Sequence, residues 1–104
     1  MKDTISPAEL EELLNRGADI KVLDVRRREH RVAVEHPIPG AEWRDPEQIA
    51  EWSQKLGEHG EVIVYCVHGH NVSQGARDFL RGLGLHARIV EGGIEAWQAF
   101  NKES

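Results

Sequence analysis

The chain contains one cysteine, in a segment that could carry a reactive thiol. The segment YCVHGHNVSQGA, residues 65–76, follows Cys66 with two histidines, a glycine and a serine. A thiol attacks as a nucleophile only after ionisation, and its ordinary pKa of about 8.5 leaves most of it protonated near neutral pH. Cys66 therefore needs a local source of positive potential if it is to react.

A strand, a loop and a helix around Cys66 would supply that potential. Apolar and β-branched residues in EVIVYC, Glu61–Cys66, predict a strand that ends at the cysteine, and Ser73 can cap a following helix. Loop amides and the positive end of the helix would then surround a thiolate, a persulfide or an oxyanion. A buried cysteine at the end of a core strand would show the same pattern, because free cysteine is among the most buried residue types. The pattern leaves both interpretations open.

A metal site is the third interpretation of this segment. Cys66, His68 and His70 alternate, so a fully extended chain would place all three on one face. Gly69 predicts a turn that breaks this geometry, and structural zinc usually needs four ligands. No paired spacing is present among the remaining histidines, His30, His36, His59 and His86. We therefore predict no metal, and we expect His68 and His70 either to face solvent or to assist binding of an anion.

Helices and strands alternate along the rest of the chain. Ser6, Pro7 and Glu9 begin a helix that stops at Gly17. The further predicted elements are a strand at 20–25, a short helical turn at 27–34, a helix after Asp45, the strand at 61–66, a helix from Ser73 with Ala76, Phe79, Leu80 and Leu83 as its apolar positions, a strand at 87–91 and a helix carrying Ile94, Trp97 and Phe100. This order predicts an α/β fold, a mostly parallel sheet with helices on both faces, whose ligands bind beyond the carboxyl ends of the strands.

Length and composition limit the remaining possibilities. The 104 residues fit one domain, 1–104, and 39% hydrophobic with 30% charged residues is ordinary for a globular protein. A net charge of −5 argues against nucleic-acid binding. No apolar run is long enough for a signal peptide or a membrane span, so we expect a cytoplasmic protein without a membrane partner. One cysteine excludes an intrachain disulfide.

Four segments, in this order, resemble the single-domain rhodanese family. VLDVR, at 22–26, is similar to the family's first core strand with its acidic residue and arginine. HPIPGA, at 36–41, resembles the family's His-Ile-Pro-Gly-Ala signature with an additional Pro37. YCVHGHNVSQGA falls where the family has its catalytic cysteine loop, and VEGGIEAW, at 90–97, is similar to its closing Gly-Gly and Trp motif.

The resemblance implies a rhodanese-like fold and a sulfurtransferase. Cys66 would take the outer sulfur of a donor such as thiosulfate and pass it, as a persulfide, to cyanide, a small thiol or a thiol protein, with no metal or organic cofactor. Asp24 and Arg26 would brace nearby loops, Gly92 and Gly93 would form a tight turn, and Trp97 would belong to the core. Binding of the persulfide and substrate falls to Val67, His68, Gly69, His70, Asn71, Val72 and Ser73, with Arg77 in the following helix.

The loop also departs from the family pattern. The span from Cys66 to Val72 is one residue longer than usual and resembles that of phosphatases and arsenate reductases of the same fold. Those enzymes clamp their oxyanion with an arginine, and Val72 stands in its place here. We therefore rank a phosphatase or arsenate reductase below a sulfurtransferase. A sulfur carrier or sensor without turnover is the third alternative.

Overall fold

A parallel sheet forms the centre of the fold. The computed structural model describes residues 3–30, 38–56, 61–67 and 71–103. All strand pairs are parallel, and the strand order is β1-β5-β4-β2-β3. The strands are β1 (Thr4–Ile5), β2 (Ile20–Asp24), β3 (Glu42–Trp43), β4 (Glu61–Tyr65) and β5 (Ala87–Val90). The strand that leads to the cysteine therefore lies at the centre of the sheet.

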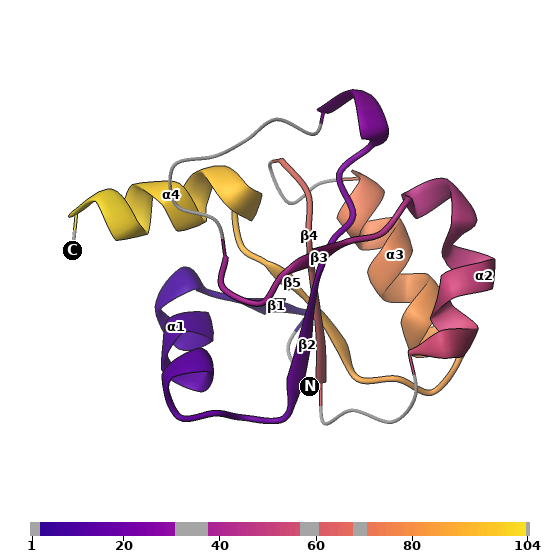
Figure 1. Ribbon diagram of the computed structural model, residues 1–104, viewed down its shortest axis with the longest axis horizontal. Coiled ribbons are helices and arrows are strands. Elements are labelled where there is room, and N and C mark those ends of the chain that lie inside the picture. Colours follow the sequence, from indigo (N-terminus) through magenta and orange to yellow (C-terminus); the bar gives the residue numbers. More distant parts are fainter. Residues whose placement is uncertain (1–2, 31–37, 57–60, 68–70, 104) are drawn as a thin grey trace.

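Helices cover both faces of this sheet. Figure 1 shows α1 and α4 on one face and α2 with α3 on the other. The helices are α1 (Pro7–Asn15), α2 (Ile49–Trp52), α3 (Asn71–Gly82) and α4 (Gly93–Glu103), with short 3-10 turns η1 (Arg28–His30), η2 (Pro46–Gln48) and η3 (Ser53–Lys55). None of the helices in the described part of the chain has the length and apolarity that crossing a membrane requires.

Helix α1 begins as the capping sequence predicts. The Ser6 hydroxyl accepts a hydrogen bond from the Glu9 amide at 3.1 Å, and Pro7 occupies the first turn, where its missing N–H costs nothing. Asp45 acts in the same way before η2, because its carboxylate accepts from the Glu47 amide at 3.0 Å. Both helical segments start where a side-chain acceptor replaces a missing backbone partner.

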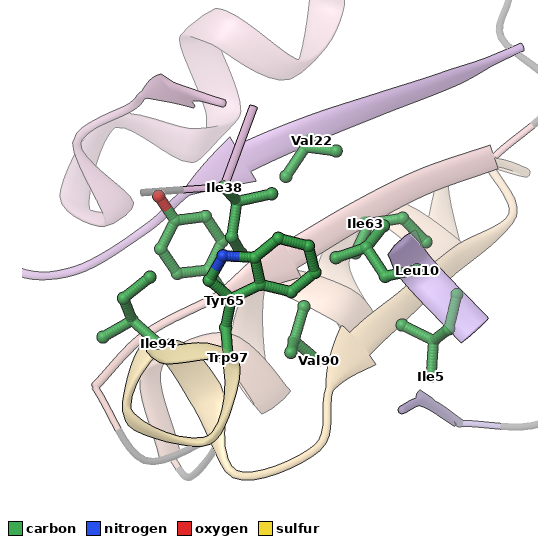
Figure 2. Close-up of a cluster of buried hydrophobic side chains, with 9 residues drawn as sticks. All are labelled: Ile5, Leu10, Val22, Ile38, Ile63, Tyr65, Val90, Ile94 and Trp97. Atoms are coloured by element: carbon green, nitrogen blue, oxygen red, sulfur yellow. The ribbon is translucent and has the colours of Figure 1, made fainter. Parts of the chain in front are cut away.

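Two apolar clusters hold the layers together. One cluster lies between the sheet and α1 with α4, and Figure 2 shows its side chains: Ile5, Leu10, Val22, Ile38, Ile63, Tyr65, Val90, Ile94 and Trp97. The other lies under α2 and α3 and consists of Leu23, Val25, Leu56, Val62, Val64, Ala76, Leu80, Ala87 and Ile89. Because successive strand residues point to opposite faces, Val62 and Val64 belong to one cluster and Ile63 and Tyr65 to the other. Trp97 is a core residue, as predicted.

The structure corrects several sequence-based expectations. Strands β1 and β3 were not predicted, and the helical turn expected at 27–34 is described only as η1, while 31–34 lie outside the described residues. The helix expected after Asp45 is divided into η2, α2 and η3. Of the four apolar positions assigned to the helix from Ser73, Ala76 and Leu80 are buried, whereas Phe79 and Leu83 have exposed fractions of 39% and 54%. Leu83 follows the last residue of the helix, and Phe79 faces the edge of α3 that looks toward α2.

Candidate active site

The thiol of Cys66 lies directly beyond the end of the central strand. Its side chain is buried, with 7% of the residue exposed. The sulfur is 3.1 Å from the hydroxyl oxygen of Ser73, and either atom can donate the hydrogen. Ser73 has no exposed surface. The fold therefore brings a thiol and a hydroxyl together in a place largely shielded from water.

Ser73 does not cap the helix, which was its predicted role. Helix α3 begins two residues earlier, at Asn71, so Ser73 lies inside its first turn and directs its hydroxyl to Cys66. The unpaired amides of a first turn and the helix dipole give this end of α3 a positive potential. A helix start of this kind can bind an anion placed beside it.

The start of α4 also contacts the cysteine, through its backbone. The amide of Ile94 donates to the carbonyl of Cys66 at 3.0 Å, and that of Glu95 to the carbonyl of Val67 at 3.4 Å. Gly93 has φ +64°, and a Cβ there would lie within 3.0 Å of both carbonyl oxygens. The glycine pair thus does more than turn the chain. Gly93 allows the helix to approach the residues that carry the sulfur.

A buried ion pair lies at the end of the neighbouring strand, β2. The Arg26 guanidinium donates from Nε to both oxygens of Asp24 at 3.0 Å and from Nη2 to one of them at 2.8 Å. The Arg26 amide donates to the same carboxylate at 2.9 Å. The hydrogen bonds to Asp24 raise the pKa of Arg26 despite its burial. Burial first, and then the charge of Asp24, raise the pKa of Tyr65, which therefore stays a neutral phenol.

Backbone groups of Val25 and Arg26 connect three strand ends near Cys66. The Val25 amide donates to the Tyr65 carbonyl at 2.9 Å, and the Trp43 indole N–H donates to the Arg26 carbonyl at 2.8 Å. Asp24 and Arg26 lie at the end of β2, which pairs with the strand that delivers the cysteine, and their bracing role stays a prediction. Tyr65 and Trp43 were not singled out from the sequence. Tyr65 carried a signal, since it directly precedes Cys66, whereas Trp43 carried none.

The remaining predicted site residues are only partly described. Asn71 and Val72 belong to the first turn of α3, and Val67 directly follows Cys66. His68, Gly69 and His70 lie outside the described residues, so their predicted roles remain predictions. Arg77 donates to the carboxylate of its neighbour Asp78 at 3.0 Å. Its predicted contact with substrate is therefore untested.

The signature segment at 36–41 is also partly described. Ile38 is 2% exposed and belongs to the same apolar cluster as Tyr65 and Trp97. Gly40 has φ +76°, and the Ala41 amide donates to the Ile38 carbonyl at 3.2 Å, so the segment forms a turn before β3. His36 and Pro37 lie outside the described residues. The described part of the signature supports the core below Cys66.

Known proteins share this arrangement. A model of the rhodanese-like domain family matches residues 6–100. A rhodanese-related protein from Thermoplasma volcanium is 30% identical with a TM-score of 0.78, and the match covers 95% of this chain and 93% of that one. A thiosulfate sulfurtransferase from Pseudomonas aeruginosa is 25% identical with a TM-score of 0.79, over 97% of this chain but 19% of that one.

A third structure bears on the alternative chemistry. A protein of unknown function from Rhodopseudomonas palustris, described as a possible tyrosine phosphatase, has a TM-score of 0.81 over 95% of this chain and 81% of its own. At 22% identity it shows the fold alone. No relative was found among curated proteins.

Proposed function

The chain belongs to the rhodanese-like domain family, and from this premise we propose that it is a sulfurtransferase whose nucleophile is Cys66. One observation carries the proposal. The sulfur of the only cysteine lies at the carboxyl end of the central strand, 3.1 Å from the buried hydroxyl of Ser73 and beside the first turn of α3. Parallel α/β sheets bind their ligands at this edge, and the helix end favours an anion there.

The first step charges Cys66 with sulfur. The Cys66 thiolate attacks the outer sulfur of a donor such as thiosulfate, a new S–S bond forms, and the S–S bond of the donor breaks. Sulfite leaves with the electron pair, so the step needs no oxidant or reductant. Ser73 can donate its hydroxyl hydrogen to the sulfur of Cys66 before and after this exchange.

The second step regenerates the free thiolate of Cys66. An acceptor such as cyanide or a thiolate attacks the outer sulfur of the persulfide, the S–S bond breaks, and the Cys66 thiolate leaves. The products are thiocyanate or a new persulfide. The cycle is a covalent two-step transfer and requires neither a metal nor an organic cofactor. The partners that we propose are therefore a small sulfur donor and an acceptor that is a small molecule or a thiol protein.

The charge of the loop limits the choice of donor. No lysine or arginine occurs between Cys66 and Ser73, and the net charge of the chain is −5. Among the described residues of the loop and the first turn of α3, the stabilising groups are backbone amides, the Ser73 hydroxyl and the α3 dipole, and none of them carries a full positive charge. We therefore expect thiosulfate, a dianion, to be a weak donor compared with a persulfide. The same absence argues against phosphatase chemistry, because the loss of one oxyanion donor in acyl-transfer enzymes costs about 2.7 to 4 kcal/mol and a missing arginine clamp should cost a similar amount.

The proposal is tested by measuring thiocyanate formation from thiosulfate and cyanide. The wild type and Cys66→Ser are compared, and phosphate release from an aryl phosphate is followed in parallel. We expect saturable thiocyanate production by the wild type and background rates from Cys66→Ser, whose hydroxyl is a far weaker nucleophile. Circular dichroism of both proteins controls for folding.

Two results would contradict the proposal. Cys66-dependent phosphate release without thiocyanate would mean that the longer loop selects a phosphatase. Persulfide on Cys66, detected by mass spectrometry but transferred to neither cyanide nor thiols, would identify a sulfur carrier or sensor instead of an enzyme.

A further inference from the structure

A hollow outside the sheet begins beside the candidate active site. It has a volume of about 310 Å³ and lies between α3 and the segment formed by η2 and α2. Its walls are mostly apolar. They consist of Val72, Gly75, Ala76 and Phe79 on α3, Pro46 and Ile49 on the opposite side, and the charged residues Arg27 and Glu47. We call this hollow the α3 groove.

The α3 groove exposes an apolar side chain that the core does not use. Phe79 is 39% exposed, and the helical spacing of Val72, Ala76 and Phe79 places the three on one side of α3. Leu83 is also exposed but lies outside the groove, beyond the end of the helix. Phe79 is therefore available to contact a ligand in the groove, and Leu83 serves as its natural comparison.

The charges of the groove describe the ligand further. Arg27 is exposed and forms no hydrogen bond or ion pair with another residue in the described ranges. Its neighbour Arg28, by contrast, pairs with Asp45 at 3.5 Å. Arg27 is complementary to one carboxylate of a ligand, whereas Glu47 in the same groove would repel a run of acidic residues.

The position of the groove relative to Cys66 sets the size of the ligand. Val72 lines the groove and directly precedes Ser73, whose hydroxyl is 3.1 Å from the sulfur. Phe79 lies six residues beyond Ser73, which is about 9 Å along a helix. An extended peptide matches this rise with about three residues, and the turn of the helix between Ser73 and Phe79 leaves room for one more. Cyanide or sulfite cannot span it, but a polypeptide with its thiol at Cys66 can.

We propose that the α3 groove binds an apolar side chain of the protein that exchanges sulfur with Cys66, two to four residues from the reactive cysteine of that protein and next to an acidic residue that pairs with Arg27. This inference rests on the proposed sulfur transfer. It names the partner as a polypeptide whose sequence is read on α3. The groove thus makes a thiol protein the preferred acceptor over a small thiol.

Short acceptor peptides of defined sequence test the groove directly. The probes are blocked peptides Cys-Gly-Gly-Phe-Asp and its reversed order, counterparts with Ser in place of Phe, and Cys-Phe-Asp, whose apolar residue is too close to the thiol. Persulfide transfer gives KM, and fluorescence anisotropy of labelled peptides on Cys66→Ser gives Kd without chemistry. We expect the Phe peptides to bind about tenfold more tightly than the Ser peptides, from partial burial of one aromatic side chain, and Cys-Phe-Asp to show no such gain.

Matched variants assign the effect to the groove. In Phe79→Ser the ratio between Phe and Ser peptides should fall to about one, whereas Leu83→Ser should keep the ratio of the wild type. All the probe peptides carry Asp, so Arg27→Gln should weaken the binding of each of them, whereas Arg28→Gln should not. Equal affinity of Phe and Ser peptides for the wild type, or a ratio that survives Phe79→Ser, would overturn the inference.

The outcomes separate this inference from the proposed function. If the wild type forms no thiocyanate but binds peptides in a way that depends on Phe79, the groove is confirmed and the proposed sulfur transfer is wrong. If the wild type transfers sulfur normally but shows no preference among the peptides, the sulfur transfer is confirmed and the groove is wrong. If sedimentation shows a dimer that dissociates in Phe79→Ser, and peptides show no preference, a second copy of this chain occupies the groove and the inference is wrong.

Discussion

At the scale of single residues, the hydroxyl of Ser73 takes the place beside Cys66 of the charged lysine or arginine side chain that the loop lacks. A hydrogen bond to an ionised sulfur is stronger than one between neutral groups, and burial of both side chains excludes competing water. This contact is the only side-chain hydrogen bond of Cys66 within the described residues. Ser73 is therefore expected to position the sulfur and to stabilise the negative charge that the sulfur carries during transfer.

This expectation is measured by the rate of persulfide transfer at one fixed pH. Ser73→Ala removes the hydroxyl, so its kcat/KM should fall about 10- to 150-fold below that of the wild type. This loss corresponds to about 1.5 to 3 kcal/mol, the range of a hydrogen bond to a charged group. Ser73→Thr keeps a hydroxyl and should restore most of the wild-type rate. Equal rates of wild type and Ser73→Ala would show that the contact does not stabilise the reacting sulfur.

The sequence was informative about some of these residues and silent about others. Cys66 could be assigned to the end of a strand because its preceding residues are apolar and β-branched. The contact with Ser73 could not be predicted, because it depends on α3 starting at Asn71 and not at a Ser cap. Asp24 and Arg26 were recognised by resemblance. Their ion pair with each other could not be predicted, because it depends on the orientation of the two side chains at the end of β2.

At the scale of elements, the junction between the Gly92–Gly93 turn and α4 fixes the backbone that carries the sulfur. Two amides of α4 bind the carbonyls of Cys66 and Val67, which satisfies groups that a helix start and a strand end would otherwise leave unpaired. A side chain at position 93 would push these two segments apart. The closing glycine motif is thus a packing requirement of the candidate active site.

Two glycine substitutions measure this requirement. Gly93→Ala should reduce the free energy of unfolding by about 3 kcal/mol, the sum of roughly 1 for a left-handed conformation and roughly 2 for the close contact. Gly84 has φ +88° but open space around it, so Gly84→Ala should reduce the free energy of unfolding by only about 1 kcal/mol. Urea unfolding of both variants provides the comparison. Equal losses would mean that the approach of α4 to Cys66 is not tight.

Prediction of elements from the sequence worked where a pattern was long enough. Capping residues and periodicity identified α1, and runs of β-branched residues identified β2, β4 and β5. Strands β1 and β3 have two residues each, which is too few to show a period. The apolar positions assigned to α3 share a helical spacing, but Leu83 falls after the helix end and Phe79 is partly exposed. Helical spacing shows which residues share one side of a helix, but it does not show how much of that side is buried.

At the scale of the whole molecule, the sheet separates two apolar clusters that share the same strands. Leu10 belongs to the cluster beside α1 and α4, and Leu80 to the cluster under α3, and neither is exposed. Substitutions on opposite faces share no side-chain partner. Their effects on stability should therefore be independent, although the domain unfolds as one unit.

A double substitution tests this view of the molecule. Leu10→Ala and Leu80→Ala should each cost about 2 to 5 kcal/mol, and the double variant should lose the sum to within about 0.5 kcal/mol. Leu83→Ala, at 54% exposure, should change stability by at most about 0.5 kcal/mol. Denaturant titrations that detect a coupling above about 1 kcal/mol would show that the two clusters communicate through the sheet.

The order of the strands has a consequence for the synthesis of the chain. Strand β4 pairs with β2, which precedes it in the chain, and with β5, which follows it. The carbonyl of Cys66 accepts its hydrogen bond from the amide of Ile94, which also comes later in the chain. A ribosome releases these partners only after the cysteine has emerged. During that interval the thiol lacks the neighbours that bury it in the finished fold. We therefore expect the nascent protein to lose its nucleophile to oxidants more readily than the mature one.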